Sequence, residues 1–341
     1  MYSQRMRAPR RRTSTRPRVT SSIATALVVL FSTFVTPFAA TAQALEQVRP
    51  VEQSSPATPV EYRFESSSEA VVAAWTAPNP DAIVIAIHGF GLHKFAFKDF
   101  AEQMQRQNVS TYAIDVRGFG GWAQSAGGAR VDFRRTLEDL ETLVRTIRGE
   151  WPGKPVFVMG ESMGGAIALA YAAAHPASID GVISSVPSNK RFHRMRTTAR
   201  IAAQYVLSGG RKINLDEVLV KRVTNDKALR TCWRNDAEAK LHVTLRELVR
   251  FNGFMKAVPR IVKEIDAVPV LVVQGYNDHL VMPAGTKKLF DNLSTGDKQF
   301  LLVQNAEHLV FEAGQFDESV VQELERWLAR HEKPALLASN R

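Results

Sequence analysis

The stretch Gly160-Glu161-Ser162-Met163-Gly164-Gly165 decides the fold of this chain because of what lies on either side of it. Residues 155–159 before it are apolar and predict a buried strand, and residues 166–174 after it are rich in helix formers. A serine at so sharp a strand-to-helix turn has strained backbone angles and an exposed hydroxyl. Small neighbours are needed there, since the strand and helix backbones pass close together. The pattern therefore predicts a nucleophilic Ser162 at the start of a helix.

The same alternation of strand and helix extends along most of the chain. Buried-type strands are predicted at residues 83–87, 110–114, 155–159, 181–185, 269–273 and 299–303, after two weaker strands near 62–65 and 70–76. Helices are predicted at 95–107, 131–148, 166–174, 284–293 and 317–330. Such an alternation is typical of an α/β fold with a mostly parallel central sheet flanked by helices.

The alternation stops between residues 187 and 266, where the pattern is helical without a convincing strand. We interpret residues 61–186 and 267–341 as the α/β core and residues 187–266 as an inserted helical cap. Residues 45–60, rich in Pro, Gln, Ser and Glu, predict a poorly ordered leader. An insertion at this point of the chain would lie over the carboxyl edge of the sheet, where such folds bind ligands.

The first 44 residues read as an export signal. A basic segment precedes the apolar run Ile23–Phe38, and Ala42-Gln43-Ala44 is a small-x-small cleavage site. The apolar run is shorter than the ~20 residues that a membrane span needs. We therefore expect an exported protein, periplasmic or secreted; an uncleaved N-terminal membrane anchor is the alternative.

The net charge of +10 is unevenly distributed. Residues 1–44 contain seven arginines and no acidic residue, so residues 45–341 carry only +3, and a nucleic-acid partner is not expected. Residues 187–266 hold 18 Lys and Arg against 8 Asp and Glu, which leaves the rest of the exported chain negative. We expect the basic cap to attract an anionic membrane surface or lipid head group. Its apolar candidates for an acyl channel are Phe192, Met195, Tyr205, Leu207, Phe251, Phe254 and Met255.

A serine nucleophile needs a general base and an acid that orients it. His308 follows the 299–303 strand and Asp278 follows the 269–273 strand, so both are expected at the carboxyl edge of the sheet beside Ser162. The chain order Ser, Asp, His is that of an α/β-hydrolase. Asp266 and Asp291 are weaker alternatives for the acid, because they fall before a strand and within a helix.

The oxyanion that forms during acyl transfer needs two backbone N–H donors. We expect them at Met163, directly after the nucleophile, and at Phe90, in the loop after the 83–87 strand. His88 at the start of that loop is interpreted as a structural brace. No metal or cofactor is predicted. Cys232 is the only cysteine, which excludes an intrachain disulfide, and we interpret it as a packing residue.

Taken together, these motifs resemble the monoacylglycerol lipase and lysophospholipase branch of the α/β-hydrolases, the serine aminopeptidase S33 type, over about residues 60–330. The resemblance rests on His88-Gly89-Phe90-Gly91, Asp115-x-Arg117-Gly118-x-Gly120, the elbow at 160–165, Gly275-x-x-Asp278-x-x-Val281-x-Pro283 and Glu307-His308. It implies hydrolysis of single-chain acyl esters under a mobile cap, without metal or cofactor.

Two other functions are compatible with such a chain. An aminopeptidase of the same fold would need acidic groups near the site to bind the substrate ammonium, and the positive cap argues against it. A non-catalytic binding module is the second alternative, and the intact set of Ser162, Asp278 and His308 argues against that.

Overall fold

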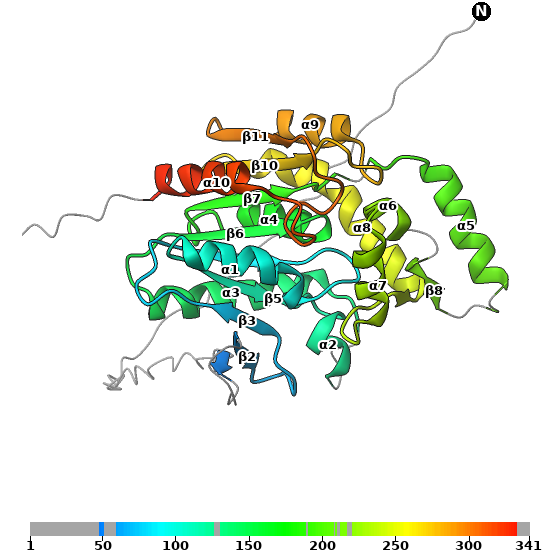
Figure 1. Ribbon diagram of the computed structural model, residues 1–341, viewed down its shortest axis with the longest axis horizontal. Helices are drawn as coiled ribbons and strands as arrows, with labels where there is room; N and C mark the ends of the chain where they lie inside the picture. Colours follow the sequence, from blue (N-terminus) through cyan, green and yellow to red (C-terminus); the bar gives the residue numbers. More distant parts are fainter. Residues whose placement is uncertain are drawn as a thin grey trace, which may run out of the picture. The chain divides into compact units, whose positions relative to one another are not determined.

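The computed structural model of the chain describes residues 48–50, 59–125, 130–188, 190–207, 209, 212–216 and 220–332. These residues form one nine-stranded sheet and a separate two-stranded ribbon (Figure 1). The strands of the large sheet are β1 (Val48–Pro50), β2 (Val60–Phe64), β3 (Val72–Trp75), β4 (Ala82–Ile87), β5 (Val109–Ile114), β6 (Val156–Glu161), β7 (Gly181–Ser185), β10 (Val270–Gly275) and β11 (Lys298–Val303). The predicted export signal, residues 1–44, lies outside the described residues.

The sheet is mostly parallel, as the alternation predicted. Its strand order is β1-β2-β3-β5-β4-β6-β7-β10-β11. All pairings from β5 to β11 are parallel, whereas β1, β2 and β3 form an antiparallel edge. Within the predicted leader, Val48–Pro50 extend the sheet by pairing with β2, whereas residues 45–47 and 51–58 lie outside the described residues. Parallel strands end on one edge, so the loops after β4, β6, β10 and β11 meet there.

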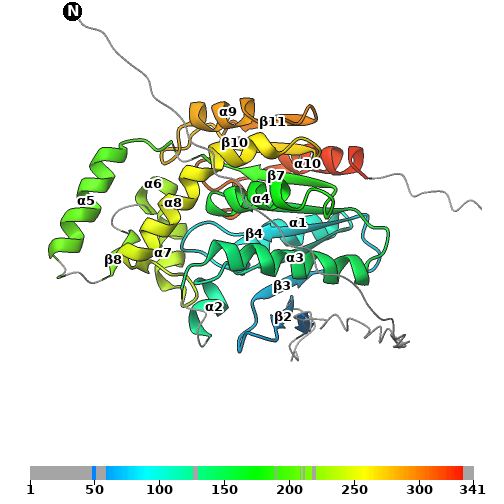
Figure 2. The same ribbon diagram turned by 180° about the vertical axis from the view of Figure 1, so that it is seen from behind.

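Helices cover both faces of the sheet (Figures 1 and 2). They are η1 (Lys94–Phe97), α1 (Lys98–Arg106), α2 (Gly120–Gln124), α3 (Phe133–Glu150), α4 (Met163–Ala174), α9 (Pro283–Asp291) and α10 (Glu318–Arg330). Successive side chains of β4 point to opposite faces, as a strand requires. Ile83, Ile85 and Ile87 pack in the core that contains residues of α3, α4 and α9. Val84 and Ala86 pack in the core that contains residues of α1 and α10.

The segment between β7 and β10, which we call the cap, lies beyond one end of the sheet, with α5 farthest from the strands (Figures 1 and 2). Its elements are α5 (Arg194–Leu207), β8 (Ile213–Asn214), α6 (Lys221–Val223), α7 (Lys227–Asn235), β9 (His242–Val243), α8 (Leu245–Ile261) and η3 (Val262–Glu264). It is mainly helical, but β8 and β9 form an antiparallel ribbon that the sequence pattern did not reveal. Two residues per strand are too few to give a recognisable alternation.

Two further observations concern the described residues as a group. None of their helices is both long enough and apolar enough to cross a membrane. They contain no cluster of His, Cys, Asp and Glu side chains able to hold a metal ion.

The interpretation of Cys232 as a packing residue is wrong, since it lies exposed on α7.

Candidate active site

Ser162 lies at the turn from β6 into α4, with φ 55° and ψ −109°. A positive φ is strained for a residue other than glycine and persists only where the surroundings enforce it. The Ser162 N–H donates to the Ser185 carbonyl at 2.8 Å. A Cβ on Gly164 would lie 1.8 Å from the Ile87 carbonyl oxygen, and one on Gly160 would lie 2.2 Å from the Gly164 carbonyl carbon. The glycines of the elbow are therefore required by the close approach of β4, β6 and α4.

The structure brings the three predicted triad residues into one chain of hydrogen bonds. The distance from His308 Nε2 to Ser162 Oγ is 3.0 Å, and that from His308 Nδ1 to Asp278 Oδ2 is 2.8 Å. A carboxylate beside Nδ1 keeps the proton on that nitrogen and leaves Nε2 able to accept the serine proton. The other candidate acids, Asp266 and Asp291, are exposed and take no part in this chain. The arrangement is that of a nucleophile, a general base and an orienting acid.

Asp278 is buried and firmly anchored. Its Oδ1 accepts hydrogen bonds from the N–H groups of Leu280 (2.7 Å) and Val281 (2.8 Å). Burial alone would raise the pKa of the Asp278 carboxyl. The facing His308 and the two amide donors outweigh that effect and hold the pKa below its ordinary value. Asp278 is thus a carboxylate at neutral pH, as an orienting acid must be.

The loop after β4 carries Phe90, one of the two predicted oxyanion donors. Among the described residues, the Phe90 N–H has no hydrogen-bond acceptor. Met163, the other predicted donor, is the first residue of α4, a position whose N–H has no acceptor within the helix. Met163 follows Ser162 directly in the chain, and Phe90 lines the same pocket as Ser162. The role of their N–H groups as oxyanion donors stays a prediction.

His88 holds this loop in place through hydrogen bonds at both nitrogens of its ring. Its Nε2 accepts the Val116 N–H at 2.9 Å, so its proton is on Nδ1, which donates to the Gly89 carbonyl at 2.7 Å. Burial lowers the pKa of His88 to about 3, so the ring is neutral. The structural role expected for His88 agrees with these contacts.

Glu161, the residue before the nucleophile, was missed by the sequence analysis. Its buried carboxylate accepts hydrogen bonds from the N–H groups of Val310 (2.8 Å), Phe311 (3.1 Å) and Glu312 (2.9 Å), and from Ser185 Oγ at 2.5 Å. The three amides belong to the loop that carries His308. Glu161 therefore ties the elbow to the histidine loop. An acidic residue at the end of an apolar strand was the only signal in the sequence.

Glu312 is a second buried carboxyl that the sequence analysis missed. Its Oε1 accepts the Gly89 N–H at 2.8 Å, whereas its buried Oε2 has no hydrogen-bond partner among the described residues. Burial, and then the negative charge of Glu161, raise the pKa of Glu312 well above its ordinary value. Glu161 has four donors and Glu312 has one, so Glu312 is the member of the pair that holds a proton. Neutral Glu312 anchors the residue next to Phe90.

The glycine-rich loop at 115–121 is held in place by contacts with α3 and with the cap. Nε and Nη2 of Arg117 each lie 2.7 Å from the carboxylate of Asp139, and the guanidinium carbon lies 3.4 Å from the centre of the Trp122 ring. Lys240 of the cap donates to the Gly118 carbonyl at 2.9 Å. This loop therefore joins the core to the cap and supplies no side chain to the pocket described next.

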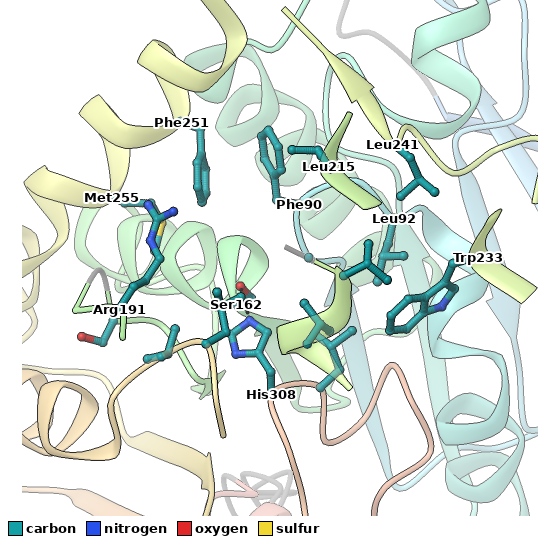
Figure 3. A pocket seen from close by; sticks show the side chains of 17 residues that line it. Phe90, Leu92, Ser162, Arg191, Leu215, Trp233, Leu241, Phe251, Met255 and His308 are labelled. Atoms are coloured by element: carbon teal, nitrogen blue, oxygen red, sulfur yellow. Dashed lines mark hydrogen bonds between the residues drawn. The ribbon is translucent and has the colours of Figure 1, made fainter. Parts of the chain in front are cut away.

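An apolar pocket opens onto Ser162 and His308 (Figure 3). The core supplies its floor and the cap its walls. The described lining residues are Gly89, Phe90, Leu92, Ser162, Ser188, Arg191, Leu215, Val220, Val223, Trp233, Leu241, Phe251, Met255, Leu280, Val281, His308 and Leu309. Most of them are aliphatic or aromatic, and no Asp or Glu is among them. The site thus presents the Ser162 hydroxyl, within hydrogen-bond distance of His308, at the floor of a hydrocarbon-lined space.

The cap residues predicted to form an acyl channel divide into two groups. Phe251 and Met255 of α8 line the pocket. Phe254 instead stacks on Phe133 with ring centres 4.3 Å apart, and Leu207 is 86% exposed. The remaining predicted residues are not among those lining the pocket, and the side chain of Met195 lies outside the described set.

Known hydrolases are similar to this chain in sequence and in fold. A protein-family model described as serine aminopeptidase, S33, matches residues 78–313, well over half of the chain. The chain belongs to this family. Over 269 residues the S33 chain is 26% identical to the monoacylglycerol lipase of Mycolicibacterium smegmatis, covering 76% of this chain and 93% of the relative. Over 259 residues it is 27% identical to the monoglyceride lipase of Rattus norvegicus, covering 73% and 83%.

A solved structure supports the same fold. The crystal structure of a soluble variant of monoglyceride lipase from Saccharomyces cerevisiae, in complex with a substrate analogue, matches with a TM-score of 0.66 at 21% identity. The match covers 86% of this chain and 98% of that chain. The α/β-hydrolase fold and the S33-type resemblance predicted from the sequence are confirmed.

Proposed function

We propose that this S33 chain hydrolyses carboxylic esters of single-chain acyl lipids, monoacylglycerols or lysophospholipids, through an acyl-enzyme on Ser162. The observation that carries the proposal is the Ser162–His308–Asp278 chain at the floor of an apolar pocket. Hydrocarbon-lined walls favour an acyl chain, because burial contributes about 0.8 kcal/mol for each methylene. The similarity to lipases at 26–27% identity points to the same substrate class.

The geometry supports an acyl-transfer mechanism. Ser162 Oγ attacks the ester carbonyl carbon while His308 Nε2 takes its proton, and the resulting imidazolium is stabilised by ionised Asp278. The N–H groups of Phe90 and Met163 bind the oxyanion. Collapse breaks the bond to the alcohol, which receives the proton from His308. Water then loses a proton to His308 and attacks the acyl-enzyme. His308 returns that proton to Ser162 Oγ as the carboxylic acid leaves, which restores the free enzyme.

The pocket favours ester hydrolysis over the aminopeptidase alternative. An aminopeptidase must bind a substrate ammonium, which requires an acidic group in the site. Among the described lining residues there is no Asp or Glu, and there is an arginine, Arg191. A cation in the pocket would repel an ammonium. The non-catalytic alternative is disfavoured by Glu161 and Asp278, whose contacts hold the serine and histidine in register for proton transfer.

The test is hydrolysis of p-nitrophenyl esters from C2 to C16 by wild type and Ser162→Ala, with labelling by a fluorophosphonate probe. We expect a long-chain optimum, loss of about a millionfold in kcat for the variant, and labelling of wild type only. A folded wild type that neither turns over esters nor is labelled would refute the proposal. Labelling without ester turnover would favour the peptidase.

We further propose that the protein is exported and works at an anionic lipid surface. The support is the signal-like sequence 1–44, the basic cap, and the exposed apolar end of α5, where Val206 and Leu207 are 75% and 86% exposed. Export predicts a mature chain starting near residue 45 in the periplasmic or culture fraction, whereas an anchored protein would stay with the membranes. Surface binding predicts that sedimentation with liposomes rises with anionic lipid and falls with salt. Binding indifferent to both would refute the surface interaction.

A further inference from the structure

The pocket differs in chemistry on the two sides of the nucleophile. Figure 3 shows Leu92 and Trp233 on one side of Ser162, and Arg191 beside Met255 on the other. The first side presents hydrocarbon and indole surface, which suits an acyl chain. The second side presents a guanidinium, and Arg191 is the only Lys or Arg among the described lining residues. A bound ester would place its acyl chain and its head group on different sides.

The backbone of Arg191 is fastened to the loop of the triad acid. Arg191 forms an antiparallel bridge with Val281, and the Phe192 N–H donates to the Leu280 carbonyl at 3.0 Å. Leu280 and Val281 are also the two residues whose N–H groups donate hydrogen bonds to the Asp278 carboxylate. Arg191 therefore has a defined position relative to the catalytic residues, although it belongs to the first residues of the cap.

The side chain of Arg191 is braced by α8. Its Nη2 donates to Asn252 Oδ1 at 2.7 Å, and its guanidinium carbon lies 5.3 Å from the centre of the Phe251 ring. Holding an arginine in place lowers the entropy that is lost when it binds a ligand. A guanidinium is planar, permanently charged and well matched to the oxygens of a phosphate.

We propose that Arg191 binds a phosphate in the head group of the substrate, so that the preferred ester is an anionic single-chain lipid. The inference rests on the proposed ester hydrolysis at Ser162. The bond that breaks is still the acyl ester bond, and the phosphate leaves intact with the alcohol. The absence of any acidic side chain from the described lining removes the repulsion that an anionic head group would otherwise meet. The positive charge of the cap draws the same substrates toward the pocket.

The experiment compares kcat/KM for three lauroyl esters, each kept below its critical micelle concentration. Monolauroylglycerol is neutral, lauroyl lysophosphatidic acid has a phosphomonoester, and lauroyl lysophosphatidylglycerol has a phosphodiester. Wild type should prefer the anionic esters. Arg191→Gln should lower kcat/KM for them by about 10- to 100-fold, mainly through KM, with a much smaller loss for monolauroylglycerol. Loss on the phosphomonoester alone would assign the site to a terminal phosphate, and loss on both would assign it to either phosphate.

Arg246→Gln is the matched control, since Arg246 is an exposed cation of α8 that does not line the pocket. Arg246→Gln should leave the preference for anionic over neutral lauroyl esters unchanged. Equal losses on neutral and anionic esters in Arg191→Gln, or an equal effect of the control, would overturn the inference while leaving ester hydrolysis in place. If Arg191→Gln does not fold, Arg191→Lys decides: a point charge without the planar fork should lose part of the anionic preference, and an unchanged preference would overturn the inference. A wild type inactive on all esters would refute the proposed function itself.

Discussion

The floor and the walls of the pocket are built in different ways. On the floor, Ser162, His308 and Asp278 are each held by hydrogen bonds of 2.7–3.0 Å from strands and loops of the core. The walls come from the cap and consist mainly of apolar side chains such as Trp233 and Phe251, which pack without directional bonds. Directional bonds fix atoms to within a fraction of an ångström, as proton transfer requires, whereas apolar packing sets only a volume. We therefore expect changes on the floor to act on kcat and changes in the walls to act on substrate choice.

Asp278→Asn should give the largest effect short of removing the nucleophile. The amide keeps the size of the side chain but cannot hold the proton on His308 Nδ1 or stabilise the imidazolium. We expect kcat to fall by about 10⁴-fold with little change in KM. Asp291→Asn, which changes an exposed acid of α9, is the control and should behave as wild type. A loss below tenfold in a folded Asp278→Asn protein would mean that another group orients His308.

The next largest effect is expected at Glu312, which forms a buried carboxyl pair with Glu161 next to the active site. Glu312→Ala removes the acceptor for the Gly89 N–H and frees the loop that carries Phe90. Loss of one oxyanion donor costs about 10²- to 10³-fold in kcat, and we expect a value toward the lower end because the loop keeps its other contacts. Glu312→Gln keeps a neutral acceptor in the same place and should retain most of the activity. Equal losses in Ala and Gln variants, measured by kcat on p-nitrophenyl octanoate, would show that the position of Gly89 is not what matters.

A change in the walls should be smaller and selective. Trp233 of α7 packs with Leu92, Val220 and Leu309 at the apolar end of the pocket. Trp233→Ala enlarges that end, so kcat/KM for C12–C16 esters should fall by about tenfold while C2–C4 esters change little. Val249→Ala, at an exposed position of α8, is the control for a cap residue outside the pocket. A uniform loss across chain lengths would mean that Trp233 supports the fold of the cap and not the acyl chain.

The difference between the hydrogen-bonded floor and the apolar walls of the pocket also explains which residues could be predicted from the sequence. The floor was predictable because its determinants are local: Gly164 is required by contact with Ile87, and Asp278 and His308 directly follow apolar strands. Glu161 and Glu312 were not, since the backbone N–H groups that they accept from lie 149 to 223 residues away along the chain. Such contacts leave no spacing pattern.

In the cap, residue type alone does not reveal which face a side chain occupies. Phe251 and Met255 were identified as pocket residues, but the equally apolar Leu207 faces outward. Trp233, Leu215 and Leu241 line the pocket and were missed. Short strands and short helices give too few turns of regular periodicity to orient a face. The walls therefore had to be seen in three dimensions, whereas the floor followed from the order of strand, turn and polar residue.

The pH dependence of stability gives the subtlest test of the floor. The raised pKa of Glu312 means that the folded protein holds a proton which the unfolded chain releases above about pH 4.3. The stabilisation from this group is thus complete below that pH and is lost as pH rises toward the raised pKa, with a limiting slope of about 1.4 kcal/mol per pH unit. Glu312→Gln has no such proton, so its free energy of unfolding, measured with urea at pH 5 to 8, should fall less with pH than that of wild type. Every other ionisable group is common to both proteins and cancels to first order, while Glu161 retains its four donors. Parallel curves for the two proteins would mean that Glu312 is ionised in the fold, and that the carboxyl pair behind Ser162 carries two charges instead of one.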